Sequence, residues 1–197
     1  MAPDARGAPV TGDAAARRGL RTLWLILAVC AAPLVASLVA FFLLPSHDRT
    51  NYGELLPTQA APGLAGVRAD GAAWTLADER GHWVVLVAAG GACDDACAKR
   101  LYATRQTRTM QGKDRERVVR VWLLTDAAAP RPATLAEHPD LVVVRADARS
   151  AGRLPKGPDA IYLVDPLGNQ VLAWPSDPDV RAMAKDVSKL LRTSRIG

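Results

Sequence analysis

An uncharged segment of 25 residues, Thr22–Ser46, restricts what this 197-residue chain can fold into, because all 25 basic and 20 acidic side chains lie outside it. An α-helix rises about 1.5 Å per residue, so Thr22–Leu44 as a helix would extend for roughly 35 Å and could cross the hydrocarbon core of a bilayer. Pro33 lies inside the segment, and membrane helices tolerate proline as a kink. We therefore predict a transmembrane anchor at residues 22–44.

The main alternative for this segment is a cleaved signal peptide, whose apolar core has roughly 7–15 residues before a small-residue cleavage site. The segment is longer than that, continues through Phe41–Leu44, and has no clean Ala-x-Ala followed by polar sequence. An uncleaved anchor is therefore favoured. Cys30 alone would be compatible with a lipoprotein, but Val29 stands where the lipidation motif needs a small residue. We expect Cys30 to be a thiol buried in the membrane.

The arginines around the segment predict its orientation. Four of them precede the segment and one closely follows it: Arg6, Arg17, Arg18, Arg21 and Arg49. By the positive-inside rule, the tail at residues 1–21 stays in the cytoplasm and the rest of the chain lies outside. In a bacterium this arrangement gives a single-pass inner-membrane protein with an outer domain in the periplasm, which is oxidising.

The composition excludes several classes of protein. The net charge of +5 is spread widely, which weakly favours membrane lipid as a partner and, without a basic–aromatic motif, predicts no nucleic-acid binding. Three cysteines are too few for a disulfide scaffold. No second uncharged run could span a bilayer, so a polytopic transporter is excluded. The sequence also lacks HExxH, P-loop and GxSxG motifs.

Residues 45–64 contain three prolines and little hydrophobic periodicity, so we predict an extended linker that leads into a domain at residues 65–197. Apolar runs and turn residues predict the elements of that domain. They are a hairpin over 67–76 with an Asp70-Gly71 turn, strands over 83–88, 118–125 and 141–145, a hairpin over 161–174 around Asp165–Asn169, a helix over 94–110 and a short helix that ends at Glu137.

The last helix has the strongest sequence signals. We expect Asp177 to cap it and Pro178 to take its first position. Apolar residues follow at spacings of three and four: Val180, Met183, Val187, Leu190 and Leu191. Buried strands that alternate with helices predict an α/β fold, a mixed β-sheet with helices on both faces. This is the arrangement of a thioredoxin-like domain.

Two cysteines, Cys93 and Cys97, follow an expected buried strand and a pair of glycines, and they open the next helix. On a helix, residues four apart share a face, so the pair could form a disulfide or hold one soft metal ion such as Cu(I) or Zn(II). The helix N-terminus lowers a thiol pKa, whereas the neighbouring Asp94 and Asp95 oppose that effect. A plain stabilising disulfide is the alternative to redox or metal chemistry.

A third metal ligand would normally be a histidine or another cysteine. The three histidines are His47, His82 and His138. His47 follows the expected anchor, His82 precedes a core strand and His138 begins a Pro-Asp turn. We expect each of them to be an ordinary surface residue.

Two segments resemble the Sco/SenC family of membrane-anchored, thioredoxin-like proteins of cytochrome c oxidase assembly. They are VLVAAGGACDDACAKRLY at residues 85–102 and IYLVDPLGN at residues 161–169, and the resemblance extends roughly over Pro57–Leu191. A divergent proteobacterial branch with NYGELL-like and LVDPLGN motifs is more similar still. The resemblance implies that Cys93 and Cys97 handle Cu(I), with a cytochrome c oxidase subunit or other oxidase assembly proteins as partners.

The sequence departs from the Sco/SenC pattern at two places. Family members have proline directly after the second cysteine, where this chain has Ala98. They also bind copper through a histidine shortly before the IYLVD-like strand, and residues 156–160 contain none. The full copper triad is therefore not expected, while a two-thiolate Cu(I) site or thiol redox work remains. Pro158 invites comparison with the cis-proline of thioredoxins, but we expect an ordinary loop proline.

Three functions are compatible with these features. The first is a membrane-anchored assembly factor for a haem–copper oxidase, not an enzyme in the usual sense, whose cysteines carry Cu(I) or keep a partner's copper-site cysteines reduced. The second is a periplasmic thiol–disulfide oxidoreductase with Cys93 as the attacking thiolate, because it lies nearest the helix start. The third is a non-catalytic membrane scaffold in which Cys93 and Cys97 form a structural disulfide.

Overall fold

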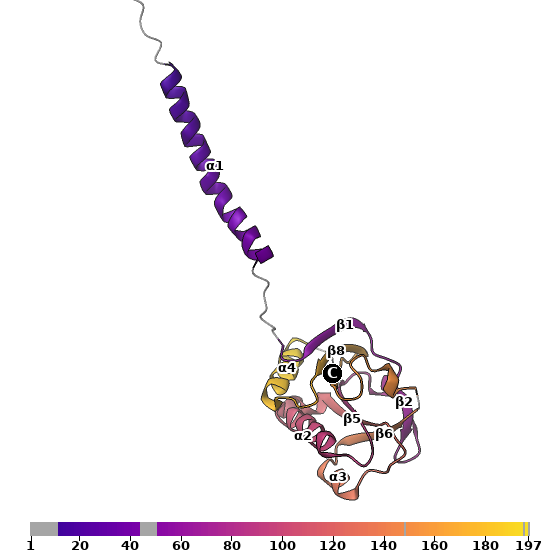
Figure 1. Cartoon of the computed structure of the whole chain (residues 1–197). Coiled ribbons are helices and arrows are strands. Elements are labelled where there is room, and N and C mark those ends of the chain that lie inside the picture. The colour runs from indigo at the N-terminus through magenta and orange to yellow at the C-terminus, as the bar shows by residue number, and fades with distance from the viewer. Residues whose placement is uncertain (1–11, 44–50, 148, 195, 197) are drawn as a thin grey trace, which may run out of the picture. The chain divides into compact units, whose positions relative to one another are not determined.

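The chain forms two compact units, Met1–Arg49 and Thr50–Gly197, in a computed structural model that describes residues 12–43, 51–147, 149–194 and 196. The first unit contains one long helix, α1 (Gly12–Leu43), drawn in indigo in Figure 1. Within the described part of the chain, no helix has both the length and the apolar character needed to span a membrane.

The predicted anchor at residues 22–44 overlaps α1, but its two ends fall outside what the structure describes. The side chains of Thr22 and of residues 40–43 are not described, and neither is any part of Leu44. The anchor therefore stays a prediction, as do the orientation of the tail at residues 1–21 and the membrane burial of Cys30.

The second unit is built on one mixed sheet of eight strands. The strands are β1 (Glu54–Ala60), β2 (Ala65–Arg68), β3 (Ala73–Thr75), β4 (Trp83–Ala89), β5 (Val118–Leu124), β6 (Leu141–Ala146), β7 (Ile161–Val164) and β8 (Asn169–Trp174). Their order across the sheet is β1-β8-β7-β4-β5-β6-β2-β3. β4, β5 and β6 are parallel, whereas β7 runs antiparallel to β4 and forms a hairpin with β8. The predicted strands and hairpins are confirmed.

Helices and short 3₁₀ turns lie between these strands, and one helix follows the last of them. They are α2 (Asp95–Thr109), α3 (Pro132–Glu137), α4 (Val180–Thr193) and three 3₁₀ turns, η1 (Leu76–Glu79), η2 (Gly112–Arg117) and η3 (Ala151–Arg153). All seven residues of β4 are buried, because this strand lies in the middle of the sheet with covered faces on both sides. α2 and α4 pack together over one face, where they bury Leu101, Met183 and Val187 against the sheet (Figure 1).

The opposite face of the sheet has a different cover from the one predicted. Its buried cluster combines Leu86 and Leu123 from the central strands with Trp74, Leu76 and Leu154. Among the described residues, none from α2, α3 or α4 belongs to this cluster. The prediction of helices on both faces is therefore wrong for α-helices: the β2–β3 hairpin, the four-residue 3₁₀ helix η1 and the chain around Leu154 bring the apolar side chains that cover this face.

The predicted linker at residues 45–64 includes a strand of the sheet. β1 pairs antiparallel with β8 at the sheet edge, with an irregularity between Leu55 and Gln59. Pro57 lies within that irregular stretch, where an edge strand can accept a residue without a backbone N–H. Gln170 Nε2 also donates to the Pro57 carbonyl at 3.1 Å. Proline content alone therefore predicted a linker where the chain forms an edge strand.

α4 begins two residues later than predicted. Asp179, not Asp177, is its N-cap residue, and its carboxylate accepts hydrogen bonds from the backbone of Arg181 at 2.8 Å and of Ala182 at 3.1 Å. Pro178 therefore lies outside the helix. Both aspartates are common N-cap residues, so the sequence alone did not discriminate between them.

Asp186 in α4 holds the start of the second unit in place. Its buried carboxylate accepts hydrogen bonds from the backbone N–H groups of Tyr52 at 3.0 Å and Gly53 at 2.8 Å, and from Trp174 Nε1 at 3.0 Å. A side chain at Gly53 would collide with the Trp174 ring. The polypeptide entering β1 is thus tied to the last helix by one buried acid.

Candidate functional site

The cysteine motif begins at a close contact between two loops. Gly91 follows β4, and a Cβ atom at this position would collide with the backbone carbonyl of Ala128. Asp126, just after β5, accepts hydrogen bonds from the backbone of Gly91 at 2.8 Å and of Ala128 at 3.1 Å. Glycine is therefore required at position 91 because residues 126–131 pack directly against the turn.

Cys93 and Cys97 form a disulfide at the start of α2, with their Cα atoms 5.1 Å apart. Asp94 is the N-cap of α2, and its carboxylate accepts a hydrogen bond from the Cys97 backbone at 2.8 Å. Cys93 has a φ of 48°, in the left-handed region that few residues other than glycine adopt. The structure thus brings together the two predicted site residues at the end of the central strand.

Both cysteines are buried, with 3% of Cys93 and 1% of Cys97 exposed. Arg131 contacts the motif, because its guanidinium donates a hydrogen bond to the Cys93 carbonyl at 2.9 Å. Together with the Gly91–Ala128 contact, this bond fastens residues 126–131 to the motif.

Arg100 connects the motif to the loop before β7. It is almost fully buried, and its Nη1 donates to the carbonyls of Ala88 at 3.2 Å and of Pro158 at 2.7 Å. Its Nε also donates to the Ala96 carbonyl at 3.4 Å. The arginine thus reaches from α2 to the loop where the Sco/SenC resemblance would place a copper-binding histidine.

The loop before β7 contains Pro158 in an ordinary trans linkage, since the described residues include no cis peptide bond. The Tyr162 hydroxyl donates to the Gly157 carbonyl at 2.7 Å and accepts from the Lys156 backbone at 2.9 Å. Burial raises the pKa of this hydroxyl, so it stays protonated and able to donate near neutral pH. The expectation of an ordinary loop proline is confirmed.

Of the histidines that the structure describes, one is exposed and one is buried. His82 is exposed, as predicted, and His47 lies outside the described residues. His138 is buried, which corrects the prediction of a surface residue. Its Nδ1 lies 3.4 Å from Nη2 of Arg120, a fully buried arginine of β5 that also contacts Thr104 of α2 and pairs with Asp140 at 3.1 Å. The sequence of β5 is otherwise apolar, so its pattern gave no indication of this buried polar cluster around Arg120 and His138.

Acid is expected to destabilise the fold through His138. Burial, and then the nearby charges of Arg120 and Arg105, lower the pKa of His138 in spite of Glu137 and Asp140. The unfolded chain therefore binds a proton at a higher pH than the folded chain, and stability present above about pH 6.5 is lost as the pH falls through the folded-state pKa. Urea unfolding of the full chain between pH 5 and pH 8 measures this loss.

A His138→Gln variant serves as the control for this acid effect, because glutamine keeps a polar side chain that does not titrate. The variant is expected to show a flatter dependence of unfolding free energy on pH. Equal slopes for the variant and the unmodified chain would contradict the assignment of the acid sensitivity to His138.

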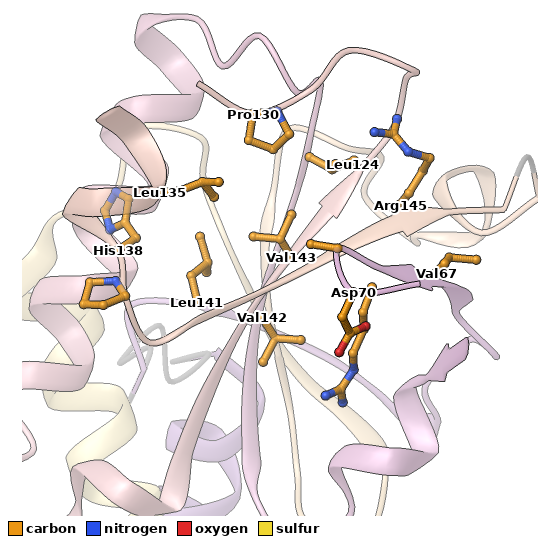
Figure 2. A pocket seen from close by; sticks show the side chains of 13 residues that line it. Val67, Asp70, Leu124, Pro130, Leu135, His138, Leu141, Val142, Val143 and Arg145 are labelled. Atoms are coloured by element: carbon orange, nitrogen blue, oxygen red, sulfur yellow. The ribbon is translucent and has the colours of Figure 1, made fainter. Parts of the chain in front are cut away.

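A hollow of about 570 Å³ lies beside β6 and α3, and neither Cys93 nor Cys97 lines it. Figure 2 shows its apolar wall, in which Leu124, Leu135, Leu141 and Val143 point toward one another, with Arg145 at the rim. The guanidinium of Arg145 donates to the Asp126 carbonyl at 2.6 Å. The hollow contains no cysteine, so the candidate site is the disulfide and not this cavity.

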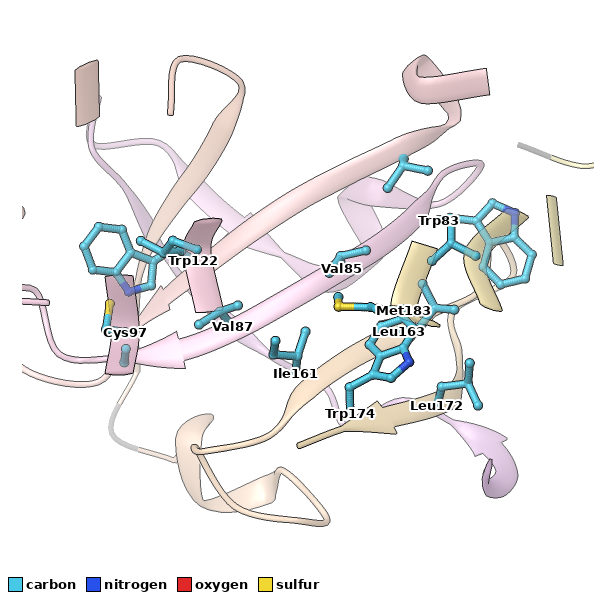
Figure 3. Packing of buried hydrophobic residues seen from close by; sticks show 14 of the residues in the cluster. Trp83, Val85, Val87, Cys97, Trp122, Ile161, Leu163, Leu172, Trp174 and Met183 are labelled. Atoms are coloured by element: carbon cyan, nitrogen blue, oxygen red, sulfur yellow. The ribbon is translucent and has the colours of Figure 1, made fainter. Parts of the chain in front are cut away.

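Trp122 is a site residue that the sequence analysis missed. It lies in β5 opposite Val87 of β4, and it shares a core cluster with both cysteines. In Figure 3 its indole nitrogen is drawn beside the sulfur of Cys97. A tryptophan within an apolar strand is ordinarily a packing residue, so only the fold indicates its place at the site.

Comparisons with known proteins agree with this fold. Residues 83–194 match the model of a protein family described as transmembrane-like, thioredoxin-like, C-terminal domain. Copper-bound ScoI from Arabidopsis thaliana is 18% identical, with a TM-score of 0.57 over 69% of this chain and all of that chain. Copper-bound Sco1 from yeast is 16% identical, with a TM-score of 0.58 over 71% of this chain and 96% of that chain.

The apo Sco1 protein from Thermus thermophilus is 19% identical, with a TM-score of 0.56 over 75% of this chain and 99% of that chain. No curated protein sequence matches the chain. The predicted thioredoxin-like mixed α/β fold is thus confirmed, and the resemblance to Sco/SenC proteins holds at the level of the fold.

Proposed function

We propose, from the premise that this chain belongs to the transmembrane-like, thioredoxin-like C-terminal domain family, that Cys93 and Cys97 form a redox pair that reduces the copper-site cysteines of a partner protein. The observation that carries the proposal is the pair itself, two cysteines in disulfide contact at the N-terminus of α2 after the central strand. The partner is a cytochrome c oxidase subunit or another oxidase assembly protein, as the Sco/SenC resemblance implies.

The proposed reaction is a thiol–disulfide exchange that begins from the reduced pair. The Cys93 thiolate attacks a disulfide of the partner, the partner's S–S bond breaks, and one partner sulfur leaves as a thiolate that takes up a proton. The Cys97 thiolate then attacks Cys93, which releases the second partner sulfur and closes the Cys93–Cys97 disulfide. Two electrons and two protons pass to the partner.

The membrane arrangement belongs to the same proposal. The chain is anchored in a bacterial inner membrane by residues 22–44, with the tail at residues 1–21 in the cytoplasm and the thioredoxin-like unit in the periplasm. The uncharged segment and the flanking arginines support this topology. An oxidising periplasm would regenerate the disulfide unless a dedicated reductant renews the dithiol, so the proposal includes a periplasmic dithiol donor.

A three-ligand copper site does not fit these residues. The described residues contain no group of three His, Cys, Asp or Glu side chains that could hold a metal ion. The loop before β7 has no histidine, and its Pro158 carbonyl is bound by Arg100. No step of the proposed exchange passes through copper.

Cu(I) carried as cargo on two thiolates is the second form of the proposal. Cys93 and Cys97 are near enough to chelate one ion after reduction, and thiolates are preferred ligands of Cu(I). The names of the Arabidopsis and yeast structures state that those proteins hold copper. For this chain, the missing third ligand favours the redox form.

One pair of measurements separates the two forms. The reduced full chain in detergent is titrated with Cu(I) against a competing chelator, beside a Cys93→Ser/Cys97→Ser variant. We expect equal Cu(I) uptake by both proteins, and a reduction potential for the pair above about −300 mV, the region of exchangeable disulfides. One ion bound per chain only in the unmodified protein would establish the cargo form instead.

The non-catalytic scaffold predicts a different reduction potential from the two thiol functions. A potential well below about −300 mV would indicate a static structural disulfide and would contradict both thiol functions. Full oxidase activity in a strain that carries only the double-serine variant would lead to the same conclusion, because a scaffold needs the fold and not the sulfur atoms.

A further inference from the structure

Trp122 carries a buried hydrogen-bond donor for which the fold provides no acceptor. None of its surface is exposed, and among the described residues its Nε1–H has no hydrogen-bond partner. A buried donor left unpaired costs about 1–3 kcal/mol. Trp174 shows the usual solution in the same core, since its Nε1 donates to Asp186 at 3.0 Å.

The unpaired indole N–H lies at the redox pair. Trp122 and Cys97 belong to one buried cluster, and Figure 3 shows the ring nitrogen directed toward the Cys97 sulfur. Cys97 is only 1% exposed, so water has little access to this sulfur. A disulfide sulfur is a weak hydrogen-bond acceptor, whereas a thiolate is charged, and hydrogen bonds to charged groups are roughly twice as strong as neutral ones.

We propose that the indole N–H of Trp122 donates a hydrogen bond to the Cys97 thiolate when the disulfide is reduced. This inference rests on the proposed redox function and adds the residue that sets the acidity and potential of the pair. The donor stabilises the reduced, deprotonated form and leaves the disulfide form almost unaffected. Trp122 thus lowers the thiol pKa of Cys97 and shifts the thiol–disulfide equilibrium toward the reduced pair.

The equilibrium is defined against glutathione, which serves as the probe. Two glutathione thiols reduce the Cys93–Cys97 disulfide, one glutathione disulfide forms, and two electrons pass to the protein. At a pH above its pKa, the Cys97 thiol releases its proton to the solvent, and only then does the indole N–H meet a charged acceptor.

The test compares Trp122→Phe with a matched control, Trp83→Phe. Trp83 lies in the same buried cluster and its Nε1 is also unpaired, but Figure 3 shows it at the far end of β4 from Cys97. Full-length proteins are equilibrated with glutathione buffers from pH 6 to pH 10. Thiolate formation is followed by ultraviolet absorbance, and unfolding in urea is measured in parallel.

Loss of the indole is expected to shift the equilibrium constant of Trp122→Phe about tenfold toward the disulfide, or about 30 mV for a two-electron couple. The shift should appear only above the Cys97 pKa, which itself rises in this variant. The Trp83→Phe control should match the unmodified protein in both quantities. A role in packing alone would change stability without this dependence on pH.

Equal potentials and thiol pKa values in Trp122→Phe and Trp83→Phe would overturn the proposal, as would a shift that does not vary with pH. If Trp122→Phe fails to fold, NMR of the unmodified protein decides the matter, because the assigned Trp122 indole N–H resonance must move downfield on reduction at alkaline pH. These measurements need no partner protein, so failed exchange with an oxidase subunit would refute the proposed function and leave this inference standing.

Discussion

Replacing Cys97 with alanine is expected to trap a partner on Cys93 as a stable mixed disulfide. The variant keeps the attacking thiol at the helix start but lacks the second thiol that completes the exchange. A suitable probe is the soluble copper-site domain of an oxidase subunit with its two cysteines oxidised. The reduced full-length variant is mixed with this domain, and the adduct is detected by non-reducing denaturing electrophoresis. The unmodified chain should leave no adduct and a reduced probe.

The matched control is the Cys93→Ala variant, which should give no adduct because the remaining Cys97 is buried within α2, next to Trp122 in Figure 3, and is the resolving thiol of the proposed exchange. Adduct formation by Cys93→Ala instead would reverse the order of the two cysteines. No adduct with either variant, under conditions in which the glutathione equilibrium confirms a reduced thiol, would contradict reduction of this class of partner.

Replacing Asp186 with alanine is expected to lower the free energy of unfolding by about 3–5 kcal/mol. The substitution removes three hydrogen bonds to a buried carboxylate and leaves Trp174 Nε1 and two backbone N–H groups without an acceptor. For a unit of this size such a loss lowers Tm by roughly 10 °C. Urea unfolding followed by tryptophan fluorescence measures the effect.

Asp179→Ala is the control on the same helix. Asp179 also accepts backbone hydrogen bonds, but it is an exposed cap, and loss of a cap costs about 1 kcal/mol. If the two variants lose equal stability, the acid at position 186 does not hold the start of β1 to the core as the structure indicates.

The central strands and the cysteine motif could be predicted from the sequence because their signals are local. Continuous apolar runs gave β4 and β5 within one residue of their ends, and glycines followed by a polar segment marked the start of α2. The sequence placed Cys93 and Cys97 at the start of α2, but Cys93 lies before the N-cap Asp94, so its left-handed backbone and not a shared helix face brings the two sulfur atoms together. The turn at Asp165 also formed as expected, with its carboxylate accepting from the Leu167 and Asn169 backbones.

The missed features depend on contacts between distant segments. Arg120 is fully buried in an apolar strand, and desolvation lowers its pKa to about 10 in spite of Asp140. Its partners lie 16 to 20 residues away, at Thr104 and Asp140, so no local pattern reveals them. The same limitation applies to Arg100, whose Pro158 contact spans 58 residues.

The edge strand β1 was missed for a different reason. Three prolines between residues 45 and 64 outweighed its weak strand pattern, although proline is acceptable at a sheet edge. Pairing with β8 and the bond from Asp186 to Gly53 supply the stability that the local sequence lacks. The predicted elements were therefore correct where a continuous or periodic apolar pattern marks them. They were wrong or missing where a contact from a residue distant in the sequence determines the local structure.

The left-handed backbone at Cys93 has a consequence for how this protein can change over generations. A single base change turns a cysteine codon into a glycine codon, and glycine adopts a φ of 48° more readily than cysteine does. Such a mutation would remove the sulfur and keep the turn between β4 and α2. A single mutation can therefore produce a domain that keeps its fold and no longer carries out thiol–disulfide exchange.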